Sequence, residues 1–230
     1  MIIFREALNE MDQPPITFIV ETSKILNPER VKSISGFQLS KFFKDYSQII
    51  PDRDISILFT GNCPELFLDE IEHILYSKGS KVKVLIKTNL TYKLDSRSIS
   101  SLKRFSSIII PFHNKYSGNY MEILISNLSS LPDKEKCVIF LNSSDKLTDD
   151  KYSALIRVAK KLGFNKISSD FNFSEELERQ CSLADMEFLE LSFLNNYNFF
   201  IEYDGTVRNP KNTNFISSIY KPVAYMFFSN

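Results

Sequence analysis

Two hydrophobic patterns alternate along the chain: short runs of consecutive apolar residues, and longer stretches in which apolar residues recur every three or four positions. The short runs are rich in β-branched residues and apolar at nearly every position, which is typical of strands buried on both faces of a sheet. The predicted strands are residues 16–20, 55–59, 82–86, 107–110, 137–141 and the shorter run 166–168.

The longer stretches have the periodicity of amphipathic helices. In residues 64–78 the apolar side chains cluster on one side, and Gly79 follows as a helix stop. Residues 149–161 repeat the pattern and are closed by Gly163. Further helices are predicted at residues 116–131, 37–46 and 174–184.

Strand and helix alternate at roughly regular intervals through residue 184, which predicts parallel strands joined by right-handed crossovers. The periodicity fits either an open doubly wound sheet or a barrel. After residue 184 the pattern changes, and Asp204 and Gly205 stand between two β-rich runs as a hairpin turn. The sequence therefore predicts an α/β domain over residues 1–184 and a short C-terminal β extension over residues 185–230.

With 230 residues, 43% of them hydrophobic, the chain is long enough for one principal domain with a sizeable core. Lys plus Arg and Asp plus Glu both number 28, so the overall charge favours neither a nucleic-acid partner nor a polybasic membrane surface. The opening residues lack the apolar core of a signal peptide, and no later run approaches the ~20 apolar residues of a membrane span. We therefore expect a soluble, cytoplasmic protein, and leave open its oligomeric state and whether it is one piece of a longer chain.

Three cysteines, Cys63, Cys137 and Cys181, are separated by tens of residues. This spacing is neither a disulfide framework nor the spacing of a zinc or iron–sulfur site. The expectation is three reduced, mostly buried thiols and no metal site.

Two motifs suggest a family. Residues 55–91 resemble the part of radical S-adenosylmethionine (radical SAM) enzymes that usually contains an apolar strand, T-G-G-E-P-L, a helix, and a strand ending in T-N-G-T. Three residues match the first motif: Thr60, Gly61 and Pro64. Three match the second: Thr88, Asn89 and Thr91. With the sequence IIIPFHN, which contains His113, and the later KLGFNKIS, the resemblance covers residues 16–168. It implies a partial (β/α)6 TIM-like barrel of the radical SAM type.

The departures from the family pattern bear on function. The family binds its four-iron cluster through a C-x3-C-x2-C loop after the first strand, whereas residues 20–37 contain no cysteine. In the first motif, Asn62 replaces the second glycine and Cys63 replaces the acid that helps to hold the cofactor's ammonium. In the C-terminal extension, Asn209 and Pro210 stand where an auxiliary-cluster enzyme usually has a cysteine. The resemblance therefore implies no cluster, no cofactor and no catalytic residues.

This combination resembles the cysteine-lacking pseudo-radical-SAM proteins found beside radical SAM/SPASM peptide maturases, including those of Gly-Gly peptide systems of Bacteroidales-type bacteria. It implies a non-catalytic scaffold or peptide-binding partner of a true maturase, which holds a peptide at the former active-site mouth or at an open lateral strand edge. The alternative is a cluster-free enzyme or small-ligand binder that uses the former cofactor pocket. The vestigial pocket comprises Thr60, Gly61, Asn62, Cys63, Pro64, Thr88, Asn89 and His113.

Several of these residues have a purely structural interpretation. Gly61 suits a strained turn from strand to helix, and Asn89 suits a positive φ. Cys63 precedes a helix, where a thiolate is stabilised and becomes nucleophilic, but a buried or vestigial thiol that fills the place of the former acid is the simpler explanation. His113 lies where barrel enzymes gather ligands, or is solvated. The aromatic residues of the tail either cover the barrel or form a protein-binding patch: Tyr197, Phe199, Phe200, Tyr203, Tyr220, Tyr225, Phe227 and Phe228.

Overall fold

The computed structural model of the chain describes residues 15–27, 30–61, 64–77, 81–112, 119–131, 133–142, 149–169, 175–189, 191, 194, 196–224 and 226. In chain order the strands are β1 (Ile16–Glu21), β2 (Ser23–Asn27), β3 (Arg30–Ser33), β4 (Ile55–Thr60), β5 (Val82–Lys87), β6 (Ser107–Phe112), β7 (Cys137–Leu141), β8 (Lys166–Ser169), β9 (Glu187–Phe188), β10 (Phe199–Ile201), β11 (Thr206–Asn209) and β12 (Asn212–Ser218). The helices are α2 (Gly36–Ile49), α3 (Leu68–Ser77), α4 (Ser96–Leu102), α5 (Asn119–Ser130), α6 (Asp149–Lys161) and α7 (Glu175–Leu183), with short 3-10 turns η1 (Pro64–Phe67) and η2 (Lys134–Lys136).

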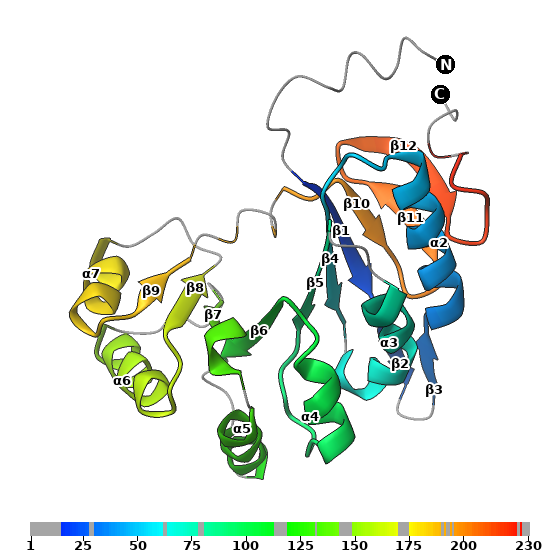
Figure 1. The fold of residues 1–230 in the computed structure, drawn as a ribbon. Coiled ribbons are helices and arrows are strands. Elements are labelled where there is room, and N and C mark those ends of the chain that lie inside the picture. The colour runs from blue at the N-terminus through cyan, green and yellow to red at the C-terminus, as the bar shows by residue number, and fades with distance from the viewer. Residues whose placement is uncertain are drawn as a thin grey trace.

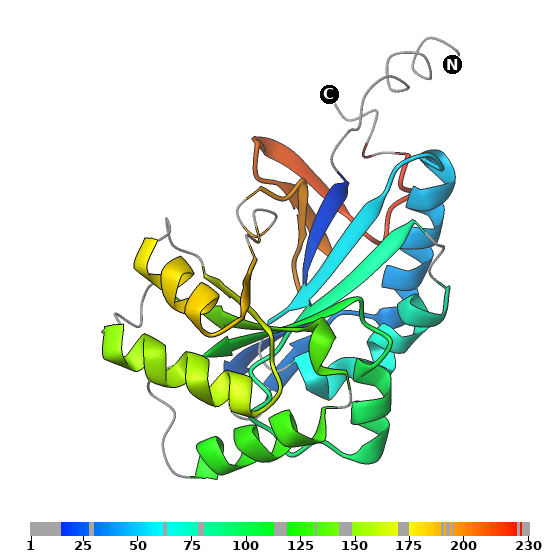
Figure 2. The ribbon, with the colours of Figure 1, turned by 60° about the vertical axis from the view of Figure 1, so that its left-hand side comes forward.

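Within the described residues, ten strands form one sheet in the order β12-β11-β10-β1-β4-β5-β6-β7-β8-β9. From β1 to β9 the spatial order follows the chain order and every pair is parallel. A doubly wound sheet would reverse its order at a switch point, and this one does not. The chain is thus an α/β protein with a mostly parallel, singly wound sheet that is not closed into a barrel, since β12 and β9 are its two outer strands. Figures 1 and 2 show the helices along the outside of the curved sheet.

All six predicted strands form, and the element at 137–141 has the predicted bounds. So does the helix at 149–161, which ends at Gly163 in a positive-φ conformation of 86°. The helix expected at 64–78 begins with a 3-10 turn and continues as α3, while Gly79 lies outside the described residues. Helix α4 and the hairpin β2–β3 were not predicted.

The last strands belong to the same sheet as the α/β units. β9 pairs with β8, whereas β10 pairs with β1 at the far side, and both pairings are parallel. The predicted hairpin at Asp204 and Gly205 is confirmed: β10 and β11 are antiparallel and Gly205 has a φ of 86°. Six strands, β1 and β4 to β8, therefore have a further strand on each side: β10 lies beside β1, and β9 lies beside β8. No helix in the described ranges combines the length and apolarity needed to cross a bilayer.

The main core lies between the sheet and the helices. Phe18 on β1 is fully buried and contacts Phe43 and Tyr46 of α2 edge to face, with ring centroids 5.1 and 4.9 Å apart. It also stacks on Phe199 of β10 at 5.1 Å, so the first unit and the returning tail share one aromatic cluster. These aromatic contacts add to the burial of large apolar surfaces and fix β10 beside β1.

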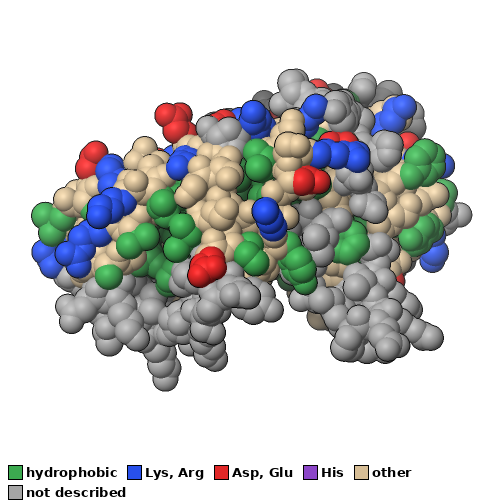
Figure 3. Space-filling model, turned by 90° about the horizontal axis from the view of Figure 1, so that it is seen from below, with side chains coloured by type: hydrophobic (Ala, Val, Ile, Leu, Met, Phe, Trp, Pro, Cys, Tyr) green, Lys and Arg blue, Asp and Glu red, His purple; other side chains and the backbone are tan. Residues whose placement is uncertain are grey.

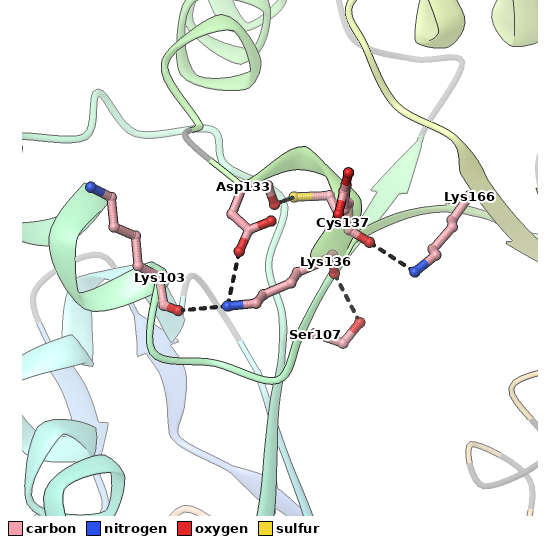
Figure 4. A network of polar contacts seen from close by, with 7 residues as sticks. Lys103, Ser107, Asp133, Lys136, Cys137 and Lys166 are labelled. Atoms are coloured by element: carbon pink, nitrogen blue, oxygen red, sulfur yellow. Dashed lines mark hydrogen bonds and ion pairs between the residues drawn. The ribbon is translucent and has the colours of Figure 1, made fainter.

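Lysine side chains link neighbouring units at the amino ends of the strands (Figure 4). The Lys136 ammonium donates to the carbonyl of Lys103 at 3.3 Å and pairs with Asp133 at 2.9 Å, and Lys166 donates to the carbonyl of Glu135 at 2.9 Å. Lysines near the last carbonyls of helices satisfy acceptors that have no partner inside the helix. At this end of the sheet, these lysines therefore help to hold neighbouring strand–helix units together.

Candidate functional site

The two sequence motifs around Thr60 and Thr88 lie at the carboxyl ends of the adjacent strands β4 and β5. Phe59 of β4 pairs with Ile86 of β5, so Thr60 is level with Lys87, and Gly61 and Thr88 follow. The structure thus brings the two motifs together at the edge where parallel α/β proteins form their ligand sites. Pro64, which opens η1, is buried. Asn62, Cys63 and His113 lie outside the described residues.

Gly61 makes a tight contact with the chain that follows β1. Its φ is 123°, and a Cβ at this position would lie 3.0 Å from the Ser23 carbonyl oxygen and 3.3 Å from both Nα and Oγ1 of Thr22. The Thr22 N–H and hydroxyl both donate to the Thr60 carbonyl, at 2.8 and 3.0 Å. The expected strained backbone at Gly61 is therefore confirmed by its positive φ. The close approach of this turn to Thr22 and Ser23 was not predicted.

The residues after β1, for which the sequence resemblance implies a loop without cluster cysteines, form a β-hairpin. β2 and β3 pair antiparallel, and the Ile34 N–H returns to the Thr22 carbonyl at 3.0 Å. Thr22 and Ser23 are almost fully buried. Two described thiols are far from this hairpin, because Cys137 begins β7 and Cys181 lies in α7. Among the residues described, no group of His, Cys, Asp or Glu side chains has the arrangement of a metal site.

The second motif is held in place by backbone bonds. Thr88 is 1% exposed; its N–H donates to the Ile109 carbonyl at 2.9 Å and its hydroxyl accepts from the Leu90 N–H at 3.3 Å. The expectation of a positive φ at Asn89 was wrong, because the positive φ, 51°, belongs to Leu90. The Thr88 hydroxyl forms a side-chain turn with the N–H two residues on, and the positive φ lies at Leu90, the last residue of that turn.

Sequence reasoning missed Asn127, which fixes the loop behind the second motif. Its side chain is 3% exposed, and its amide nitrogen donates to the carbonyls of Leu90 and Tyr92 at 2.9 and 2.6 Å. Its amide oxygen accepts from the Leu94 N–H at 3.1 Å. The signal was an asparagine on the apolar stripe of α5, one position before Leu128.

The concave face of the sheet is filled by the segment that connects β9 to β10. Ile19, Leu58, Ile109 and Phe140 form a second apolar cluster there, and Leu191, Leu194, Tyr197 and Phe200 pack against it. Asn198 anchors the segment to β1: its side-chain oxygen accepts from the Thr17 N–H at 2.8 Å, and its own N–H donates to the Thr17 carbonyl at 2.9 Å. The chain's own side chains therefore cover the concave face at this apolar cluster.

The carboxyl end of the concave face carries a few polar groups. The Lys87 ammonium lies 4.4 Å from the centre of the Phe140 ring. Ser168, which pairs with Phe140 across β7 and β8, is fully buried, and its hydroxyl has no hydrogen-bond partner. The Ser169 hydroxyl, on the opposite, helix-covered face with Leu141, is also buried without a partner. Buried polar groups of this kind are uncommon and point to bound water, a ligand or stored strain.

Other surface features lie away from this site. A polar hollow of about 470 Å³ lies at the amino ends of β8 and β9; its lining residues are Lys160, Asn165, Ser182, Asp185, Met186 and Glu187. Figure 3 views the end toward which β1 and β4 point, and positive and negative side chains are interspersed over its described surface.

The two described thiols predict a loss of stability at alkaline pH. Burial raises the pKa of Cys137 to about 12 and that of Cys181 to about 11, with smaller contributions from the Asp133 and Glu178 carboxylates. An unfolded thiol has a pKa of about 8.5, so above that pH the unfolded chain loses protons that the folded chain keeps. Each thiol should then lower the free energy of unfolding by up to about 1.4 kcal/mol per pH unit.

Urea titrations at pH 7.5, 8.5 and 9.5 measure this effect, with Cys137→Ala as the matched variant. Replacement lowers stability at every pH by creating a small cavity, but the decline above pH 8.5 should be shallower than in the wild type. Parallel declines in the two proteins would show that Cys137 does not keep its proton on folding.

No protein-family model and no curated protein matches the chain in sequence.

Proposed function

We propose that the chain is a non-catalytic, radical-SAM-like pseudoenzyme that acts as a scaffold or peptide-binding partner in the maturation of a ribosomally made peptide. Within the open α/β sheet, we further propose that six strands form a partial (β/α)6 barrel: β1, β4, β5, β6, β7 and β8. Support comes from the sequential, parallel, singly wound order of these strands, which is the winding of a barrel rather than of a doubly wound sheet.

The single observation that carries the proposal is the hairpin β2–β3. In the resembled enzymes the residues after the first strand must supply three thiolates at close spacing to hold a cluster. In this chain these residues contain no cysteine, pair with each other as strands, and begin with Thr22 bound to the turn at Gly61. The second support is the filled concave face, since Leu191, Leu194 and the neighbouring aromatic residues occupy space that a barrel enzyme keeps for substrate.

Anaerobic reconstitution with iron and sulfide tests the loss of catalysis. The expected product is colourless protein that forms no 5′-deoxyadenosine from S-adenosylmethionine, whereas a cluster-binding maturase from the same genome, treated in parallel, turns brown and does. A brown, paramagnetic preparation of this chain that releases 5′-deoxyadenosine would contradict the proposal.

Co-purification tests the partner. The tagged chain is expected to retain a neighbouring radical SAM maturase or its precursor peptide, and to change the rate at which that maturase modifies the peptide. A control with the tag on an unrelated protein of similar size removes non-specific capture. Failure to retain any maturase or precursor encoded nearby would leave the scaffold role without support.

A second candidate function is favoured by the orphan hydroxyl of Ser168. A cluster-free enzyme or small-ligand binder would use polar groups at the carboxyl ends of the strands, and a buried donor without a partner is what such a ligand would satisfy. Calorimetry with S-adenosylmethionine distinguishes the two functions. Saturable binding that weakens in Ser168→Ala would favour the ligand binder, and the absence of heat in both proteins would favour the scaffold.

A further inference from the structure

We propose that the outer edge of β12 is the docking edge for an extended peptide segment that is apolar in its middle and acidic at its ends. The inference names the binding surface of the peptide-binding role proposed above, and rests on that role for its biological meaning. The geometry that leads to it belongs to β12 alone.

The backbone N–H and C=O of Ile216, in the middle of β12, face the outside of the sheet. Ile219 donates to the Gly205 carbonyl at 2.9 Å, and Val207 pairs with Ser217 two residues along. Because bonded and non-bonded pairs alternate in an antiparallel ladder, the N–H and C=O of Ile216 point away from β11. No described strand pairs with this side of β12, which is the end of the sheet order (Figures 1 and 2).

Within its seven residues the strand lacks lysine and proline, while two of its outward groups are already bonded: the Asn214 N–H donates to Asn212 Oδ1 at 3.2 Å, and the Ser218 carbonyl accepts from the Lys221 N–H at 3.1 Å. Proteins commonly protect an exposed edge with lysines, prolines or very short strands. β12 has seven residues, Asn-Thr-Asn-Phe-Ile-Ser-Ser, none of which is charged or proline. Ile216 is 59% exposed beside the free backbone groups, and Tyr220 just beyond the strand is 57% exposed. The ladder between β11 and β12 has a register shift at Arg208 and Asn209, near the start of β12, so we place the docking edge at the regular part of the strand around Ile216.

Charge decides between a foreign peptide and a second copy of the chain. Two exposed lysines, Lys211 and Lys221, bracket the uncharged strand, and neither forms an ion pair with the residues described. Two copies paired antiparallel about Ile216 would bring the lysine-bearing turn at each end of one β12 near the lysine-bearing turn of the other, and like charges close together are destabilising. A segment with acidic residues at its ends would instead meet a complementary charge at each end.

The experiment uses a fluorescein-labelled peptide of alternating valine and threonine with two glutamates at each end, and an otherwise identical peptide with lysines at the ends. Fluorescence anisotropy with the full chain is expected to show saturable binding of the glutamate peptide and weaker binding of the lysine peptide. Ile216→Pro removes the outward N–H without touching a bond to β11, because proline is tolerated on an edge whose N–H faces solvent. It should weaken binding at least about tenfold.

Ile216→Thr is the matched control, because it keeps the N–H and the β-branch; it should change the affinity less than about threefold. Reversing both charges, Lys211→Glu with Lys221→Glu, should exchange the preference between the two peptides. Equal melting temperatures for all variants separate lost binding from lost folding.

The remaining outcomes either count against the proposal or separate it from the proposed function. Equal affinity of wild type and Ile216→Pro, or no saturable binding up to about 1 mM peptide, would overturn it. Self-association of the wild type that Ile216→Pro abolishes would assign the edge to a second copy and also overturn it. If the maturase's precursor is retained equally by Ile216→Pro, the proposed function stands while this edge is excluded. If the probe binds and no maturase or precursor does, the edge stands while the proposed function fails.

Discussion

Replacing Gly61 with alanine is expected to lower the free energy of unfolding by about 3 kcal/mol, which corresponds to a melting temperature roughly 6–12 °C lower for a domain of this size. Two costs add. A φ of 123° lies in a region that L-residues avoid, and the new Cβ would sit 3.0 Å from the Ser23 carbonyl oxygen. The neighbour that would have to move is backbone, and it belongs to the segment that Thr22 ties to the Thr60 carbonyl. Relaxation would therefore break the contact between the turn and the hairpin.

Gly163→Ala provides the matched control for backbone strain alone. Gly163 also has a positive φ, 86°, but a Cβ there would first meet Lys134 Cδ at 3.4 Å, an ordinary contact with a flexible side chain. The control should lose only about 1–2 kcal/mol, the usual cost of the left-handed conformation. Thermal and urea unfolding of the two variants measure the difference. Equal losses would show that the approach of residues 22 and 23 to Gly61 contributes nothing to stability.

The strands could be predicted from the sequence, but their order could not. A parallel strand covered on both faces must be apolar at nearly every position, and Phe18, Ile19 and Val20 show this pattern, with Ile19 facing the concave side and its neighbours facing the helices. For the same reason the pattern does not reveal which face a residue occupies or which strand lies beside it. The return of β10 to β1 depends on contacts such as Phe18 with Phe199, residues far apart in the chain.

The elements that were missed are those with the weakest hydrophobic pattern. Helix α4 is mostly serine, and its clearest signal is the cap, in which the Asp95 carboxylate accepts from the Ser98 N–H at 2.7 Å. The β2–β3 hairpin has short strands, and its contact with the turn at Gly61 is made by backbone atoms and the Thr22 hydroxyl, which no hydrophobic pattern records. In the candidate site, the positions of Thr60, Gly61 and Thr88 followed from their motifs, whereas the filling of the concave face did not, because apolar residues such as Leu191 and Leu194 fit a surface strand equally well.

Replacing Asn127 with leucine is expected to lower the free energy of unfolding by about 3–5 kcal/mol, although leucine is similar in size and suits the apolar stripe of α5. The side chain is buried and satisfies two carbonyls, of Leu90 and Tyr92, and one N–H, of Leu94. Leucine would leave all three without a partner, and an unsatisfied buried group costs about 1–3 kcal/mol. Ser129→Ala, on the exposed face of the same helix, should stay within about 0.5 kcal/mol of the wild type.

Asn127→Asp tests whether the hydrogen bonds, rather than packing, carry this stability. Aspartate keeps the shape and the acceptor for the Leu94 N–H, but at neutral pH it sets a negative charge against two carbonyl oxygens. The environment therefore raises the pKa of the introduced carboxyl above its unfolded value, and protonation restores one donor. The deficit relative to wild type should be smaller at pH 4 than at pH 7, because a raised folded pKa contributes stability at low pH that is lost as the pH rises. Hydrogen exchange at the Leu94 amide should accelerate at pH 7 in Asn127→Leu. An unchanged deficit at both pH values, together with protected exchange at Leu94, would mean that the loop behind Thr88 is held by packing alone.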